Sequence, residues 1–287
     1  MTTPRANFLP ITVVTLILAA LYVPLMLLAN VPAAQRSLES GAVLDCKTAW
    51  ECAWDLRSPV VPAPSQLARG IAALSWPPFA NTAIPYNAFI TGLETLVGLG
   101  LAALVGLGFA VLLVASRAFE KAILPWLIAS QTVPVVAIAP MLAVLLGQYG
   151  VQGWFPKAII AAYIAFFPIS IGVAKGLRSP DALALDLMKT YNASSLQTFS
   201  VLRFPASVPY LFTAFKVSAA AALVGSIIGE ISTISTGGLG KMLAENSRAS
   251  DVVGTWVLML ASGLLGIALV ALVNRLEGWV TPWQRNR

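Results

Sequence analysis

Two carboxylates stand out among the side chains of this sequence that could take part in acid–base or ion chemistry. Glu230 and Glu94 each lie within a long stretch of small and apolar residues. A carboxylate in such surroundings is costly unless it pairs with a donor or borders a water-filled path. We therefore expect both to line a path for a polar solute or, alternatively, to pair inside the protein with Lys157 or a backbone N–H.

Polar residues also interrupt the apolar stretch 122–147, where Gln131 and Thr132 precede Pro134. Proline lacks a backbone donor, so a helix here should break or kink, with its freed carbonyls facing protein or water. Gln131 and Thr132 are candidates for the same path. Alternatively, they are packing groups satisfied across neighbouring helices.

Other kinds of chemistry are poorly supported by the composition. The chain has no histidine, so the commonest general base and metal ligand is missing. Gly240-Lys241 lacks the first glycine and the final Ser or Thr of a phosphate-binding loop. We expect no catalytic residue, no metal site and no enzymatic activity in this chain.

The two cysteines, Cys46 and Cys52, share one segment and cannot by themselves assemble a zinc cluster. In an oxidising compartment they would form a local disulfide. Two free thiols are the alternative, because the compartment decides the outcome. We favour the disulfide.

The elements that must position these side chains are long apolar helices. Of 287 residues, 58% are apolar and 10% are charged, whereas soluble domains carry about 25% charged residues. A helix needs roughly 20 apolar residues to span a bilayer, and six segments qualify: 8–29, 88–115, 122–147, 157–177, 211–234 and 252–273. The sequence predicts an all-α, polytopic membrane protein with six transmembrane helices, in which Gly98 and Gly106 allow close helix packing.

The distribution of lysine and arginine predicts the orientation of these helices. The loops on the same side as the N-terminus hold most of the basic residues. We therefore expect a protein of the inner (plasma) membrane with both termini in the cytoplasm. Residues 1–87 then form an anchor helix and an outer loop, and residues 88–280 form the core. The first apolar run exceeds the about 7–15 residues of a signal peptide, so we expect an anchor rather than a cleaved leader.

One cytoplasmic loop, residues 178–209, carries local helix signals. Ser179 as cap, with Pro180 and Asp181 after it, predicts a helix start. An apolar stripe too short to span follows, and Asn192 should end the helix in the left-handed conformation. The stripe consists of Leu183, Leu187 and Tyr191.

A second short helix is predicted directly after the first. Ser194 and Gln197 form a capping box, and Pro205 and Pro209 should close the segment and force a turn into the next span. The loop is therefore a helical hairpin on the cytoplasmic face. Such a hairpin needs no partner by itself, but its exposed apolar stripe suits a docking partner.

The same loop resembles the EAA loop of binding-protein-dependent ABC importer permeases, which runs Glu-Ala-Ala, three residues, Gly, nine residues and Ile-x-Leu-Pro. In this sequence Asp186 takes the place of the Glu, Asn192 of the Gly, Leu202 of the Ile, and Phe204-Pro205 of Leu-Pro. Leu187 and Met188 replace the two alanines, so the motif is degenerate. The likeness extends over roughly residues 60–280 and is strongest to the nitrate/sulfonate/taurine branch.

This resemblance implies a type I ABC importer (MetI-like) permease fold, with residues 88–280 as the permease core and 178–209 as its coupling loop. The implied ATPase-coupling residues are Asp186, Lys189, Tyr191, Asn192, Ala193, Ser194, Leu202 and Pro205. The implied partners are a dimer of ATP-binding cassette subunits, a second permease copy or a paralogue, an extracytoplasmic solute-binding protein and the lipid bilayer. No nucleic acid is expected.

The resemblance also implies which subunit binds ATP and what kind of solute is transported. ATP and Mg²⁺ are expected on the partner subunit, and no cofactor on this chain. The solute is expected to be sulfonate-, taurine- or nitrate-like, or a vitamin precursor. The alternative is an ion-coupled secondary transporter that uses Glu94 and Glu230, which would usually show inverted repeats; the sequence has none that we can find.

Overall fold

The computed structural model describes residues 9–40, 46–233 and 237–282. Within these ranges every regular element is a helix and there is no strand. The long helices are α1 (Leu9–Glu39), α4 (Ile84–Ala115), α7 (Phe155–Leu177), α10 (Phe204–Ser232) and α12 (Val252–Val280). The shorter ones are α2 (Ala49–Cys52), α3 (Pro64–Ser75), α5 (Arg117–Thr132), α6 (Val135–Gln148), α8 (Ala182–Thr190), α9 (Ser195–Gln197), the π-helix η1 (Thr198–Arg203) and α11 (Leu239–Arg248).

In the part of the chain that the structure describes, five helices are long and apolar enough to cross a membrane, which confirms the all-α polytopic architecture. They include five of the six predicted spans; Phe8 and Ile234, predicted ends of two of them, lie outside the described residues. The sixth predicted span, 122–147, is divided between α5 and α6, which are bent by 96°. At about 1.5 Å per residue, neither half reaches the ~30 Å of the hydrocarbon core alone.

The chain divides into two compact units. Unit 1 comprises Met1–Pro77 and Glu245–Met259, and unit 2 comprises Pro78–Ala244 and Leu260–Arg287. In unit 1 the buried side chain of Asn30 in α1 donates to the carbonyls of Ala53 (3.1 Å) and Val61 (2.8 Å). It also accepts the backbone N–H of Val60 (2.9 Å) and of Val61 (3.1 Å). One amide therefore holds the segment after α2 against α1.

The same unit contains the predicted disulfide. Cys46 and Cys52 are bonded, with their Cα atoms 5.3 Å apart. Cys52 is buried with Ala34 and Leu56 in a small apolar cluster. The bond closes a short loop beside α2 and gives this part of unit 1 a covalent constraint in addition to the hydrogen bonds of Asn30.

In unit 2, α7 packs closely against both α4 and α10, and glycines make this possible. A Cβ added at Gly98 of α4 would lie 2.5 Å from the Cβ of Ala161, and one at Gly106 would lie 2.8 Å from Cγ2 of Ile169. On the other side, a Cβ at Gly225 of α10 would lie 2.7 Å from the Cα of Ala161. The predicted packing role of Gly98 and Gly106 is confirmed, since any larger side chain would push the helices apart.

Candidate functional site

A buried charge cluster joins the three central helices of unit 2. We use this name for Glu94 of α4, Lys157 of α7 and Glu230 of α10. The Nζ of Lys157 lies 3.2 Å from Oε1 of Glu94, and the two side chains are 2% and 1% exposed. Lys157 also interacts electrostatically with Glu230, which is buried as well. Charges so far from water are tolerated only when they are paired and hydrogen-bonded.

Glu230 in addition holds the beginning of α11. The hydroxyl of Thr91 lies 2.7 Å from Oε1 of Glu230, and the backbone N–H of Gly240 donates to Oε2. The N–H of Leu239 donates to the Thr91 hydroxyl (2.8 Å). The first N–H groups of a helix have no partner within it, so side chains from α4 and α10 cap α11 here.

Gly238, directly before α11, lies against the same carboxylate. Gly238 has a φ of +114°, and a Cβ at this position would lie 2.2 Å from Cδ of Glu230. Its N–H donates to Oδ1 of Asn87 at 2.7 Å. A side chain at residue 238 would therefore be strained by its backbone conformation and would collide with Glu230.

Asn87 and Thr91 were not identified from the sequence. Together with Thr95, whose hydroxyl lies 3.0 Å from that of Ser226, they recur every four residues along α4. This spacing places them on one face of the helix. A polar stripe within an apolar span is the signal that could have revealed them beside Glu94.

The structure forms the paired arrangement that was one of the two expectations for these carboxylates. Lys157 is the partner of Glu94, and a backbone N–H is a partner of Glu230. All three side chains of the buried charge cluster are enclosed between helices. A role for Glu94 and Glu230 in a solute path stays a prediction.

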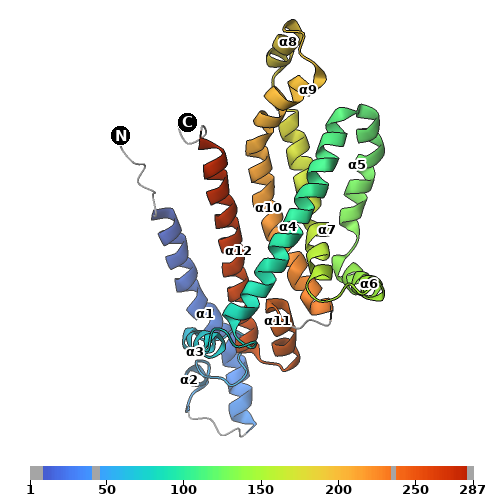
Figure 1. Cartoon of the computed structure of the whole chain (residues 1–287). Coiled ribbons are helices and arrows are strands. Elements are labelled where there is room, and N and C mark those ends of the chain that lie inside the picture. Colours follow the sequence, from blue (N-terminus) through green and yellow to red (C-terminus); the bar gives the residue numbers. More distant parts are fainter. Residues whose placement is uncertain (1–8, 41–45, 234–236, 283–287) are drawn as a thin grey trace. The chain divides into compact units, whose positions relative to one another are not determined.

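At the other end of unit 2, α8 and α9 protrude beyond α7 and α10 (Figure 1). We call residues 181–204 the coupling segment. Its first helix begins at Asp181, whose carboxylate accepts the N–H of Ala184 at 2.7 Å. The cap is therefore Asp181 and not Ser179, because Asp181 has the extended backbone of an N-cap and the better-placed acceptor.

The predicted end of that helix is confirmed. Asn192 has a φ of +52°, and the N–H of Ala193 donates to the carbonyl of Met188 at 3.0 Å. An asparagine tolerates this left-handed conformation better than most residues. Lys189 and Asp186 form an exposed ion pair of 2.8 Å on the helix surface.

The second helix begins with the predicted capping box. The N–H of Ser194 donates to the side chain of Gln197 (2.8 Å), and the N–H of Gln197 donates to the hydroxyl of Ser194 (3.3 Å). The predicted turn at Pro205 and Pro209 is wrong, since the chain stays helical from Ser195 to Ser232. Pro205 stands near the beginning of α10, directly after η1, which shifts the hydrogen-bond register of the continuous helix.

Several apolar side chains of the coupling segment face outward. Leu183, Tyr191 and Leu196 are each more than three-quarters exposed, and Leu187 and Val201 more than half. None of the residues in α8 or α9 is buried. Leu202 is half-buried and Pro205 exposed. The segment therefore presents a firmly capped, uncovered apolar surface.

Comparison with known proteins shows which family this chain belongs to. Residues 98–286 match the family described as the inner membrane component of binding-protein-dependent transport systems, which is more than half of the chain. The chain belongs to this family. It is the permease subunit of an ABC importer in the inner membrane, and such importers also have an ATPase and a solute-binding protein.

Individual relatives agree with the family. The chain is 28% identical over 191 residues to the formylaminopyrimidine transport permease protein ThiX of Halalkalibacterium halodurans, covering 67% of this chain and 74% of the relative. It is 35% identical over 175 residues to a probable ABC transporter permease protein of Haemophilus influenzae (60% and 69% covered). It is 25% identical over 171 residues to the putative aliphatic sulfonates transport permease protein SsuC of Bacillus subtilis (60% and 60% covered).

These findings confirm the resemblance inferred from the EAA-like loop and favour it over the ion-coupled alternative. The matched region contains Lys157 and Glu230, whereas Glu94 precedes it. Within the permease, Glu94 thus extends the buried charge cluster into a part of α4 that the family match does not include.

The permease also contains the predicted helix break. α5 ends at Thr132 and α6 begins at Val135, with Pro134 in extended conformation between them. Both candidate polar side chains are exposed and bonded within α5: Gln131 donates to the hydroxyl of Ser130 (3.3 Å), and Thr132 to the carbonyl of Ala129 (2.7 Å). The structure does not bring them together with the buried charge cluster, and their place in a path stays a prediction.

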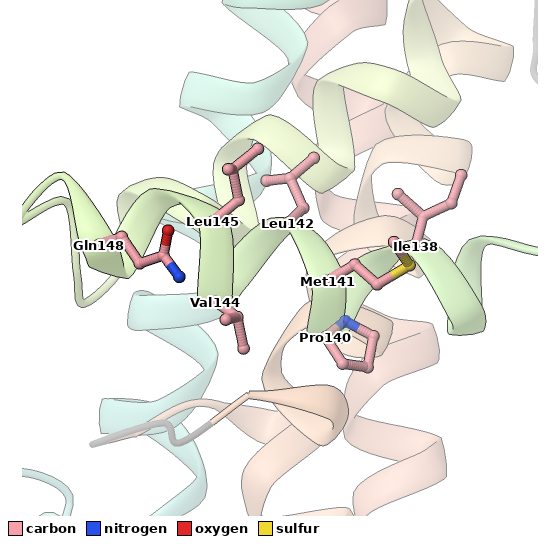
Figure 2. A pocket seen from close by; sticks show the side chains of 7 residues that line it. All are labelled: Ile138, Pro140, Met141, Leu142, Val144, Leu145 and Gln148. Carbon is pink, nitrogen blue, oxygen red and sulfur yellow. The ribbon is translucent and has the colours of Figure 1, made fainter.

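After the break, α6 of the permease is almost entirely apolar and borders a groove of about 640 Å³. Figure 2 shows Leu142 and Leu145 on one side of the helix and Pro140 and Val144 on the other. Ala139 is the buried residue of this helix. With apolar side chains on both sides, α6 requires apolar surroundings, which lipid or another membrane chain can supply.

Proposed function

We propose that the coupling segment of this permease docks on an ATP-hydrolysing subunit and that nucleotide-driven movement of that subunit opens the permease alternately to the two sides of the membrane. The observation that carries the proposal is the exposed apolar surface of Leu183, Leu187 and Tyr191 on a capped helix outside the spans. Covering apolar surface stabilises a complex by about 25 cal/mol per Å².

The connection between the coupling segment and the spans supports this role. The helix from Ser195 to Ser232 is continuous and runs through η1 into α10. Near its far end, Glu230 bonds to α11 and to α4. A displacement of the coupling segment would therefore act on a helix that is tied to the opposite end of unit 2, which suits a two-state rocking movement.

The proposal includes the division of chemistry between subunits. ATP and Mg²⁺ bind the partner, and this chain binds no cofactor and hydrolyses nothing. Asp186, Lys189, Asn192, Ala193, Ser194, Leu202 and Pro205 shape or border the docking surface. Two permeases, identical or paralogous, work together with two ATPase subunits, and both termini of each permease lie in the cytoplasm.

The solute is proposed to be a small polar molecule delivered by a solute-binding protein outside. The names of two relatives refer to a formylaminopyrimidine and to aliphatic sulfonates, so the solute is sought among heterocyclic vitamin precursors and small sulfonates. Gln131 and Thr132 at the helix break, with Glu94 and Glu230, are the residues proposed to shape its path.

Purification tests the proposal directly. The tagged permease, extracted from its native membrane in mild detergent, is expected to copurify with a subunit that binds ATP. Vesicles containing the complex should take up solute only when ATP is present on the side of the membrane that the ATP-binding subunit faces. Uptake that persists in nucleotide-free vesicles, with no ATP-binding subunit in the preparation, would contradict it.

A further inference from the structure

A groove of about 610 Å³ lies where α5 faces α7 in unit 2. We call it the α5–α7 groove. Its apolar walls are Leu124 and Ile128 of α5 and Phe167 and Ile171 of α7. Ile128 is 52% exposed, so its side chain is available to a molecule that enters the groove.

Charged residues border one end of this groove. Arg178 directs its guanidinium to Glu120 (2.7 Å) and to the carbonyl of Leu113 (2.7 Å), which joins α7 to the beginning of α5 and the end of α4. Lys175 also borders the groove and is exposed. Within residues 9–40, 46–233 and 237–282, Lys175 forms no ion pair.

Two more basic residues add to the charge. Arg117 and Lys121 lie close enough to Glu120 to interact with it electrostatically. Of the charged residues that line the groove, Lys175 and Arg178 are positive and Glu120 is negative, a net charge of +1, and Arg117 and Lys121 add positive charge beside Glu120. An anion at this end of the groove is therefore attracted although Glu120 is present.

The positions of the charged and apolar lining residues along α7 indicate the shape of the ligand. Lys175 lies in the last turn of a membrane-spanning helix, and Phe167 lies eight residues before it. At about 1.5 Å per residue, the apolar wall extends ~12 Å from the charged end into the level of the hydrocarbon core. A free inorganic anion would use only the charged end, whereas an amphiphile would use both.

We propose that the α5–α7 groove binds an anionic phospholipid. Its phosphate lies on the ammonium group of Lys175, in the positive field of Arg178, and one acyl chain lies along Leu124, Ile128, Phe167 and Ile171. Arg178 remains bonded to Glu120 and positions the end of α7 beside α5. The groove thereby selects the charge of the headgroup as well as accepting the chain.

Native mass spectrometry of the full transporter in mild detergent tests this proposal. Phosphatidylglycerol should bind in preference to phosphatidylcholine with the same acyl chains, and Lys175→Gln should reduce the preference about fivefold, the equivalent of ~1 kcal/mol for one basic residue near an anionic lipid. Lys175→Arg should retain it. Lys47→Gln, an exposed lysine of the outer segment in unit 1, is the matched control and should leave it unchanged.

A second set of variants tests the apolar half of the groove. Ile128→Trp places a larger side chain in the apolar part of the groove and should reduce binding of both lipids. The proposal fails if the wild type binds both lipids equally, or if Lys175→Gln has no effect. It also fails if glycerol phosphate competes as well as the whole lipid while Ile128→Trp changes nothing, because the site would then bind the headgroup alone. Finally, it fails if Ile128→Cys forms disulfide-linked permease dimers in membranes, because a second permease copy would then cover the groove.

Discussion

The ammonium group of Lys157 lies 3.2 Å from a carboxylate oxygen of Glu94, with both side chains almost completely enclosed between α4 and α7. Glu230 completes this buried charge cluster from α10. Each of the three central helices of unit 2 thus contributes one charged group. The cluster can hold these helices in register only while each charge keeps its partners.

Removing one member of the pair is expected to destabilise the permease strongly. Lys157→Met leaves two carboxylates without their cation, a change that costs about 3–5 kcal/mol for a buried pair. Thermal unfolding of the purified complex in detergent measures the loss. The double variant Lys157→Met with Glu94→Gln should be more stable than Lys157→Met alone, because it removes one of the two carboxylates left without a cation; equal stability of the two variants would argue against the pairing.

Gly238 should not tolerate a side chain. Gly238→Ala is strained at a φ of +114° and places a Cβ against the carboxylate of Glu230, so we expect a cost of about 1–3 kcal/mol and weaker transport. Gly100→Ala in α4 is the matched control, since nothing lies within 4 Å of the added atom. Unfolding temperature and ATP-driven uptake are measured for both variants, and equal behaviour would refute the role of Gly238.

Substitutions on the coupling segment should separate ATP hydrolysis from transport. Tyr191→Ala and Leu187→Glu alter exposed side chains and should leave insertion and thermal stability within about 0.5 kcal/mol of the wild type. Uptake per ATP hydrolysed in proteoliposomes should fall at least tenfold. Val60→Ala, a similarly exposed apolar residue of unit 1, serves as control.

Asp186 provides a finer test of the same surface. Asp186→Asn breaks only an exposed ion pair with Lys189, which is worth about 0–1 kcal/mol to stability. A loss of coupling without a loss of stability would assign Asp186 to the contact with the ATPase subunit. Unchanged coupled transport in both Asp186→Asn and Tyr191→Ala would contradict the proposed function of the segment.

The disulfide should contribute measurably to unit 1. Cys46 and Cys52 close a loop with a sequence separation of 6, and the chain-entropy estimate for such a loop is about 2 kcal/mol. Cys46→Ser together with Cys52→Ser should lower the unfolding temperature. In intact cells, a membrane-impermeant maleimide should label the wild type only after reduction; labelling without reductant would show that the thiols are free.

Much of the fold could be predicted from local sequence. Long apolar runs determine spanning helices because backbone groups in a bilayer must be satisfied within the helix. Asn192 and the Ser194–Gln197 box act over a few residues, so the positions of these helix ends were predictable. The exposed stripe of Leu183, Leu187 and Tyr191 followed from its fourfold spacing and its short length.

Tertiary structure alone decided the remaining features. The sequence offered Lys157 two possible partners, Glu94 and Glu230, and only the packing of α4, α7 and α10 through their glycines brings it to Glu94. Helix capping and hydrophobic periodicity act between residues close in the chain, so they determined where helices form and end. Pairing across 63 or 139 residues, as for Lys157 with Glu94 and Thr91 with Glu230, depends on which helices pack together and in which register, which no local pattern encodes.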